Sequence, residues 1–247
     1  MTYVAVTGLS HPGLIRERNE DSLVVGPWTL CATVTESPQT LVFPLGTPLV
    51  VAVADGLGGQ PGGEVASALV VRRLAATGDR LGTEDDVREA LHACNREVFA
   101  AAAEAGGALA TMGTTVAGAV VLPRSLLVFN VGDSRVFAAP PDGVLQLSTD
   151  DSPPLAPGRR TTTLVTQCLG GTRGYRPVVP HVTAAPLGPG DRCLISTDGL
   201  TDPLPNEMLD AVLREYDDGR AAYELWKAAI SAGGPDNITL ALVRVAE

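Results

Sequence analysis

The sequence lacks the features of membrane, secreted and nucleic-acid-binding proteins. No stretch approaches the roughly 18 consecutive apolar residues of a transmembrane helix, and no basic segment leads into an apolar run after Met1, as in a signal peptide. The 4 cysteines are far apart and form no CxxC pair, so we expect buried free thiols and not disulfides or zinc. These absences predict a cytoplasmic protein that does not bind membranes.

Basic residues and histidines are also scarce. Lys and Arg number 18 against 28 Asp and Glu, a net charge of -10, which disfavours binding of nucleic acid through phosphate contacts. The 3 histidines, His11, His92 and His181, do not lie beside the acids discussed below, which disfavours zinc again. We expect no nucleic-acid partner.

The composition is that of an ordinary globular protein. Apolar residues make up 45% and charged residues 19% of the 247 positions, enough for a substantial core without disulfides or metals. There is no internal repeat, low-complexity tail or long linker. We therefore expect residues 1–247 to form a single domain and a monomer.

Short apolar runs and longer helical patterns alternate with turns. β-rich runs bounded by Gly, Pro or Asp predict strands at 49–54, 115–122, 126–131, 192–197 and 238–245. Residues 141–143 (Pro-Asp-Gly) predict a hairpin between 136–139 and 144–147. Helices are predicted at 64–76, 84–105, 206–216 and 220–231. Because strands come in consecutive groups and not in βαβ alternation, we predict an α+β sandwich of antiparallel sheets with helices packed outside them.

Acidic residues stand where several of these strands begin or end. Asp55 follows 49–54, Asp133 follows 126–131, Asp198 follows 192–197, and Asp236 precedes the last strand. Carboxylates that converge at the rim of a sheet repel one another unless cations lie between them. Oxygen ligands suit Mg²⁺ or Mn²⁺ and not zinc. The pattern predicts a divalent-metal site.

Asp-Gly is also a common turn pair, and the chain has 4 of them, at 55–56, 142–143, 198–199 and 218–219. We interpret Asp142 and Asp218 as turn residues. Asp55 and Asp198 differ because each directly follows an apolar strand and lies within a longer pattern.

Six such patterns occur in order between residues 8 and 245: Arg16–Ser22 (RERNEDS), Asp55–Gly59 with Gly63–Ser67 (DGLGG, GEVAS), Met112–Thr115 (MGTT), Val131–Arg135 (VGDSR), Ser196–Asp202 (STDGLTD) and Asp236–Thr239 (DNIT). Together they resemble the metal-dependent protein phosphatase family, in the form of the bacterial type 2C Ser/Thr phosphatases. The resemblance implies a four-layer αββα sandwich, with two antiparallel sheets between layers of helices and a metal cleft at one end.

The resemblance also implies roles for single residues. Asp55 would bridge two metal ions, Mn²⁺ or Mg²⁺, and the carbonyl of Gly56 would bind one of them. Asp198 and Asp236 would bind the other, with Glu20 and Asp21 completing its sphere directly or through water. Asp133, with Asp198, would hold a weaker third ion.

For two of these residues a plainer interpretation stays open. Arg16 would clamp the substrate phosphate with its planar fork, but it could be an exposed arginine in a charged loop; its neighbour Arg18 is interpreted as solvated. Asp133 could be a turn residue bonded to Arg135 or to local backbone. Gly58, Gly59, Gly113 and Thr114 are interpreted as structural, allowing close backbone approach behind the metals.

The reaction implied is hydrolysis of phosphoserine or phosphothreonine without a covalent intermediate. Two metal ions would activate a shared water for in-line attack, and the ions and Arg16 would offset charge on the phosphate. The implied partners are phosphoproteins modified by a Ser/Thr kinase. Two alternatives stay open: an inactive pseudophosphatase that binds or senses a partner, and a two-metal phosphoesterase acting on small molecules.

The chain departs from the family pattern at four places. Leu57 stands where some relatives have a histidine proposed as general acid, so that acid is unassigned. Asp151 replaces the histidine of the family's Asp-His-Ser. The segment between Asp151 and Asp198 is short, which predicts a truncated flap, and 26–48 is an extra-long connection expected to form an edge strand or hairpin, with no function assigned.

Overall fold

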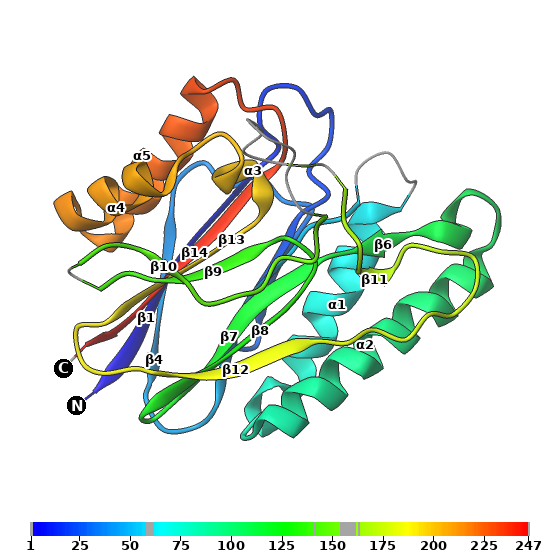
Figure 1. Cartoon of the computed structure of the whole chain (residues 1–247), viewed down its shortest axis with the longest axis horizontal. Coiled ribbons are helices and arrows are strands. Elements are labelled where there is room, and N and C mark those ends of the chain that lie inside the picture. The colour runs from blue at the N-terminus through cyan, green and yellow to red at the C-terminus, as the bar shows by residue number, and fades with distance from the viewer. Residues whose placement is uncertain (1, 58–61, 141, 154–161, 163, 247) are drawn as a thin grey trace.

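A computed structural model describes residues 2–57, 62–140, 142–153, 162 and 164–246. Two six-stranded sheets pack face to face, and helices cover the outer face of each (Figure 1). This confirms the α+β fold with two antiparallel sheets between helices. In the part of the chain that is described, no helix is long and apolar enough to cross a membrane.

The first sheet contains strands from both ends of the chain and from its middle. Its strands are all antiparallel to their neighbours and follow the order β10 (Leu145–Gln146), β9 (Arg135–Ala138), β13 (Arg192–Ser196), β14 (Ile238–Ala246), β1 (Tyr3–His11) and β4 (Gln39–Pro44). The β9–β10 pair confirms the predicted hairpin.

The second sheet is also antiparallel throughout. Its order is β12 (His181–Pro186), β8 (Ser125–Val131), β7 (Val116–Leu122), β5 (Leu49–Ala54), β2 (Ser22–Val25) and β3 (Trp28–Cys31). A short separate ladder joins β6 (Gly113–Thr114) to β11 (Leu169–Gly170). All 6 residues of β5 are buried, because one face packs on a helix and the other on the first sheet. This two-sided burial explains its continuous apolar sequence.

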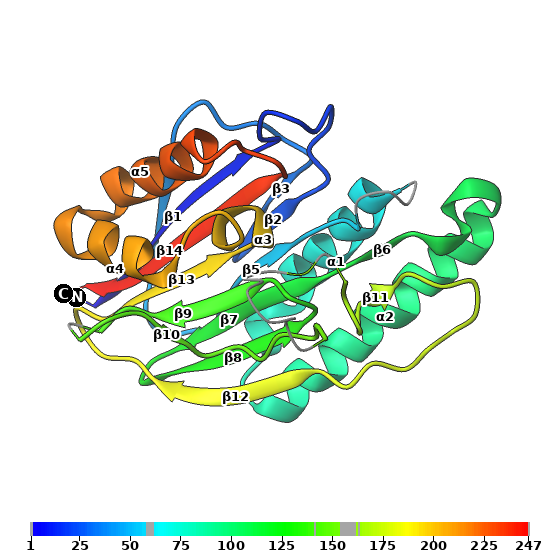
Figure 2. The ribbon, with the colours of Figure 1, turned by 45° about the horizontal axis from the view of Figure 1, so that its top comes forward.

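Each sheet has its own pair of helices (Figure 2). α1 (Gly63–Thr77) and α2 (Glu84–Ala105) cover the second sheet, and α4 (Asn206–Glu215) and α5 (Asp218–Ser231) cover the first. α2 has its predicted bounds and buries an apolar stripe, and Thr83 begins the helix with a capping box to Asp86. Two 3₁₀ turns (Gly78–Arg80 and Gly107–Thr111) and the one-turn helix α3 (Asp198–Thr201) complete the list.

Several details differ from the predictions. The strands β1, β2 and β12 were not predicted, and Asp218 is not a turn residue. Asp218 is the first residue of α5, and its carboxylate binds Arg192 Nη2 at 2.6 Å and Arg244 Nε at 2.7 Å. The long connection 26–48 forms two edge strands, β3 in one sheet and β4 in the other, which agrees with the edge strand expected there. Gly58, Gly59 and most of the predicted flap, residues 154–161, lie outside the described residues.

The strand registers bring distant parts of the chain to one end of the sandwich. Ser22 pairs with Ala54, His11 pairs with Ile238, and Ser196 pairs with Leu240. The residues just beyond these pairs are Asp21, Asp55, Asp198 and Asp236 with their neighbours. The antiparallel pairing therefore gathers acids that are as far apart in the sequence as Asp21 and Asp236.

Candidate metal centre

Asp55 is fixed where β5 ends. Its carbonyl accepts hydrogen bonds from Thr115 N–H (2.9 Å) and Thr114 Oγ1 (2.7 Å), and its own N–H donates to Thr115 Oγ1 (3.2 Å). Burial raises the pKa of Asp55 well above its ordinary value, and the charges of Asp21, Asp198 and Asp236 raise it further. The four carboxyl groups therefore share one electrostatic environment.

Asp198 begins α3, directly after Thr197. Its carboxyl group lies close enough to that of Asp55 for each to shift the other's pKa. Burial raises the pKa of Asp198, and the charge of Asp236 adds to the effect. The Oδ1 atom of Asp198 is buried and finds no hydrogen-bond partner among the described residues.

Asp21 lies directly before β2 and is fully buried. Its Oδ2 accepts a hydrogen bond from Thr197 Oγ1 at 2.9 Å, whereas its Oδ1 is buried without a partner in the described part of the chain. Burial raises the pKa of Asp21 to about 7, partly offset by hydrogen bonds from Thr239 and Thr197. An unpaired buried carboxylate oxygen is costly, so this atom calls for a cation or a proton.

Asn237 attaches the N-terminal loop to the start of β14. Its Nδ2 donates to Arg18 O (2.8 Å) and Pro12 O (3.0 Å), and its Oδ1 accepts from Glu20 N–H at 2.7 Å. The sequence patterns gave Asn237 no role, although it stands beside Asp236. It is a positioning residue for Glu20, whose pKa is raised by burial and then by the charge of Glu64.

Gly56 lies where the backbone passes between two other segments. A Cβ atom there would lie 2.4 Å from Gly63 C and 2.7 Å from Glu20 O. Only glycine fits, and its peptide therefore sits against the loop that carries Glu20. Leu57, the next residue, donates its N–H to Gly113 O at 3.0 Å and brings no acid or base to the site.

Arg16 lies at the edge of the acid cluster. Its Nη2 is 2.7 Å from Asp236 Oδ2, with 40% of the arginine side chain and 32% of the aspartate side chain exposed. The structure thus brings Arg16 to one of the predicted metal ligands. The Arg18 side chain is 79% exposed, and its Nη1 lies 3.9 Å from Glu64 Oε1, which is a weak contact. This agrees with the interpretation of Arg18 as a solvated residue.

Asp133 and Asp202 are two further acids near Asp198. Burial raises the pKa of each to about 7, and the charge of Asp198 is the next cause for both. Arg135 does not bind Asp133: its Nε and Nη2 donate to Asp150 Oδ2 at 2.9 and 2.6 Å. Of the two contacts considered for a turn residue at Asp133, the one to local backbone is present, because a hydrogen bond from its own backbone lowers its pKa. Asp202 was missed, although its spacing of four residues from Asp198 was visible in the sequence.

Asp151 binds the turn that carries Asp133. Its Oδ2 accepts from Gly132 N–H and from Gln167 Nε2, both at 2.9 Å, and its backbone N–H donates to Gly132 O, also at 2.9 Å. Its Oδ1 lies 2.8 Å from His181 Nε2. An imidazole from the start of β12 therefore contacts the carboxylate at position 151.

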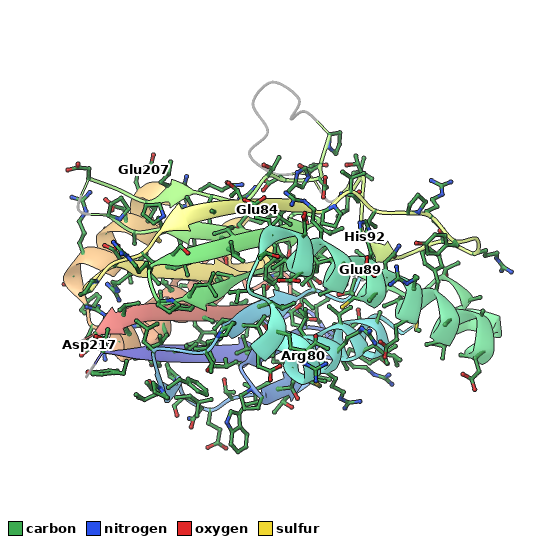
Figure 3. All side chains as sticks on the ribbon, turned by 90° about the horizontal axis from the view of Figure 1, so that it is seen from below. Arg80, Glu84, Glu89, His92, Glu207 and Asp217 are labelled. Atoms are coloured by element: carbon green, nitrogen blue, oxygen red, sulfur yellow. The ribbon has the colours of Figure 1, made fainter. Side chains whose placement is uncertain are left out.

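The other two histidines lie elsewhere. His11 is the last residue of β1, and its ring packs edge-on against Trp226 with centroids 5.3 Å apart. His92 lies on α2 with Glu84 and Glu89 (Figure 3). Neither contributes to the acid cluster, which confirms the separation of histidines from acids that the sequence indicated.

The acid cluster fits hard divalent cations. Among the described residues no three His, Cys, Asp or Glu side chains already surround one ion position, so the cluster is a gathered set of donors and not a finished coordination sphere. Its donors are carboxylates, two buried carboxylate oxygens find no partner among the described residues, and the charges of the acids raise the pKa values of their neighbours. Divalent cations would relieve both the repulsion and the unpaired oxygens.

Comparison with known proteins agrees with this geometry. A profile of the family described as Protein phosphatase 2C matches residues 42–228. The chain belongs to the protein phosphatase 2C family. The serine/threonine protein phosphatase PstP of Mycobacterium tuberculosis is 30% identical over 256 residues, covering 96% of this chain and 44% of PstP. The chain thus spans less than half the length of that relative.

Other type 2C relatives agree in length or in structure. The serine/threonine phosphatase stp of Listeria innocua is 29% identical over 214 residues, covering 78% of this chain and 83% of stp. The solved catalytic domain of PstP in complex with 2 manganese ions superposes with a TM-score of 0.78 at 28% identity, covering 100% of both chains. These matches confirm the fold and family that the sequence patterns predicted.

Proposed function

We propose that this type 2C family member hydrolyses phosphoserine and phosphothreonine in phosphoproteins with the help of two bound Mn²⁺ or Mg²⁺ ions. The observation that carries the proposal is the convergence of Asp21, Asp55, Asp198 and Asp236, where one buried oxygen each of Asp21 and Asp198 has no partner among the residues that the structure describes. The manganese ions in the similar PstP catalytic domain support it.

Each residue of the cluster has a place in this proposal. Asp55 and the Gly56 carbonyl, together with Asp198 and Asp236, would hold the ions, with Glu20 and Asp21 completing the set. Asp133 would hold a weaker third ion with Asp198. The bound ions would supply an activated water and neutralise phosphate charge.

Arg16 would bind the phosphate. Its guanidinium already pairs with Asp236 at the exposed rim of the cluster, so one donor fork could hold Asp236 and present its other N–H groups to phosphate oxygens. The pairing orients the arginine before substrate arrives. Leu57 brings no proton donor, so we propose that solvent water protonates the leaving alkoxide.

The wider setting belongs to the same proposal. The substrates would be proteins phosphorylated by a Ser/Thr kinase, and the chain would act as a single-domain monomer in the cytoplasm. Its cysteines, Cys31, Cys94, Cys168 and Cys193, are all free thiols, as a reducing compartment requires. Burial raises the pKa of Cys94 and Cys193 to about 12, so these thiols are inert.

Hydrolysis of an aryl phosphate and of a phosphothreonine peptide tests the proposal. With Mn²⁺ we expect turnover of both; EDTA should abolish it, and Asp198→Asn should lower kcat/KM by at least about 100-fold because a metal donor is lost. The matched control is Asp142→Asn, since Asp142 is an exposed turn residue outside the cluster.

Each contrary result has its own meaning. Activity that EDTA leaves unchanged would contradict the metal mechanism. A folded protein without activity in Mn²⁺ would indicate a pseudophosphatase. Turnover of the aryl phosphate without turnover of the peptide would indicate a phosphoesterase for small molecules.

A further inference from the structure

The connection 26–48, which has no assigned function, encloses an apolar cavity at the open edge of the sandwich. Its strands β3 and β4 are edge strands of opposite sheets. Between these strands and their neighbours β2 and β1 lies a cavity of about 230 Å³. Its walls are formed by Val6, Gly8, Leu23, Val25, Leu30 and Leu41.

The strand registers determine which side chains face this cavity. In the first sheet Val6 pairs with Leu41, and in the second sheet Leu23 pairs with Leu30. Paired residues of antiparallel strands point to the same face, so both pairs project into the space between the sheets. Gly8 keeps that space open, because a Cβ there would lie 2.6 Å from Leu23 Cδ2.

The lining selects a small, neutral and apolar ligand. None of the described lining residues is charged, and their polar side chains are those of Thr29 and Gln39, with the indole of Trp28 63% exposed. A charged ligand would lose its hydration without a partner here. An apolar cavity of about 150 Å³ in another protein stays dry and takes up benzene, so the larger volume here suits about two or three fused rings.

The cavity is continuous with the acid cluster along two strands. Asp21, Leu23 and Val25 follow one another at alternate positions, so all three point between the sheets. On β1 the corresponding residue is Ser10, two positions after Gly8; its Oγ binds Thr239 Oγ1 and Asn19 Nδ2, both at 2.8 Å. On β1 and at the start of β2, the cavity is therefore separated by two positions from residues at the acid cluster.

The segment that joins β3 to β4 forms hydrogen bonds with these residues near the acid cluster. Ala32 N–H donates to Asp21 O at 3.2 Å, Thr35 N–H donates to Ser10 O at 2.9 Å, and Asn19 Nδ2 donates to Thr33 O at 2.8 Å. A ligand that separates β3 from β4 would therefore pull on the backbone of Asp21.

We propose that this cavity is a binding site for a small neutral aromatic ligand, and that its occupancy alters the affinity of the acid cluster for divalent cations. The binding site stands independently of the proposed function. The effect on cations rests on the proposed metal site, and the two parts are measured separately.

Energy transfer from Trp28 to the neutral fluorophore aminoanthracene tests the binding site. The chain has 2 tryptophans, so Trp226→Phe leaves Trp28 as the single donor. In this background we expect saturable transfer, its loss in Leu41→Phe, which fills the cavity, and its retention in Val42→Phe. Val42 is the next residue of β4, is 61% exposed and points away from the cavity.

The circular dichroism spectrum of each variant establishes that it is folded, and Leu30→Phe on the opposite wall replaces Leu41→Phe if the latter is not. Absence of saturable transfer in the parent protein, or transfer that a folded cavity-filling variant retains, would overturn the binding site.

The thermal midpoint as a function of Mn²⁺ concentration tests the second part. With saturating aminoanthracene, the Mn²⁺ concentration needed for a fixed rise in the midpoint should change by at least about fivefold. An unchanged concentration, with probe binding intact, would overturn the coupling alone. A midpoint that Mn²⁺ does not move at all would contradict the proposed metal site and leave the binding result standing.

Discussion

Asp151 shows how a single residue outside the acid cluster determines the position of a residue inside it. It holds both the N–H and the carbonyl of Gly132, which directly precedes Asp133, and binds Gln167 and His181 as well. Gly132 has a φ of 109°, a conformation that a side chain rarely adopts. The turn before Asp133 is therefore held by partners and by the absence of a Cβ.

Asp151→Ala should loosen this turn without removing any metal donor. We expect a loss of about 1–3 kcal/mol in unfolding free energy from the unpaired buried groups. We also expect about tenfold more Mn²⁺ for half-maximal activity, the size of effect seen for residues that orient metal ligands. Asp142→Ala is the control, and an Asp151→Ala enzyme with unaltered Mn²⁺ dependence would show that the turn does not need Asp151.

Arg16→Lys tests whether a planar fork is required at the phosphate position. The lysine keeps the charge but cannot bind Asp236 and phosphate through parallel N–H groups. We expect kcat/KM for the phosphopeptide to fall by about tenfold or more, and Arg18→Lys to have no effect. Equal losses in both variants would indicate general electrostatic attraction in place of a specific clamp.

The sequence revealed the main acids because of where they stand. Asp55 and Asp198 each follow an apolar strand and lie within a longer pattern, and these two features together predicted a shared cleft. The pairing of Arg16 with Asp236, the role of Asn237 and the Asp151–His181 contact could not be read in this way. They join residues that are far apart in the sequence, so they depend on strand register and loop path, which local patterns do not encode.

Among the elements, the backbone just after β5 leaves no room for a side chain at Gly56. Gly56 is pressed between Gly63 and the Glu20 carbonyl, where backbone atoms cannot move aside as a flexible side chain can. Gly56→Ala should therefore displace the loop of Glu20 or the start of α1, with a destabilisation of about 1–3 kcal/mol and loss of most activity. Chemical denaturation and phosphopeptide turnover measure the two effects.

Gly46→Ala is the matched control, because a Cβ there meets nothing within 4 Å. It should leave both stability and turnover near the parent values. If the Gly56→Ala protein were as stable and active as Gly46→Ala, the backbone around Gly56 would be able to shift and accommodate a Cβ, contrary to this prediction.

Elements with strong local signals were predicted well, and strands with weak local signals were not. α2 matched its predicted bounds because its apolar spacing and its cap at Thr83 agree. β5 matched because it is apolar on both faces. β1 is interrupted by Gly8, and β3 and β4 are short and half exposed, so their strand character depends on the partners they pair with.

At the scale of the whole molecule, the acid cluster links stability to pH and to cations. Burial raises the pKa of Asp21, Asp133 and Asp202 to about 7, whereas in the unfolded chain they titrate near their ordinary value of 3.8. Between these values the folded chain binds more protons than the unfolded chain. The stability of the metal-free protein should therefore fall as pH rises from about 4 to about 7.

Thermal unfolding in EDTA at a series of pH values measures this directly. We expect the midpoint to fall by more than about 5 °C across that range, and Mn²⁺ to raise it more at pH 7 than at pH 5, because protons compete with the cation. A metal-free protein that becomes more stable between pH 5 and pH 7 would contradict the acid cluster as the dominant titrating group.

The pairing of β1 with β14 has a mechanical consequence. Tyr3 lies opposite Ala246, and the two strands run antiparallel from there to His11 and Ile238, beside Asp236. A pulling force between Tyr3 and Ala246 would load their hydrogen bonds one after another, as in opening a zipper, and not all together. The sandwich should therefore open at low force, and the tear would travel along the two strands toward the acid cluster and reach it last.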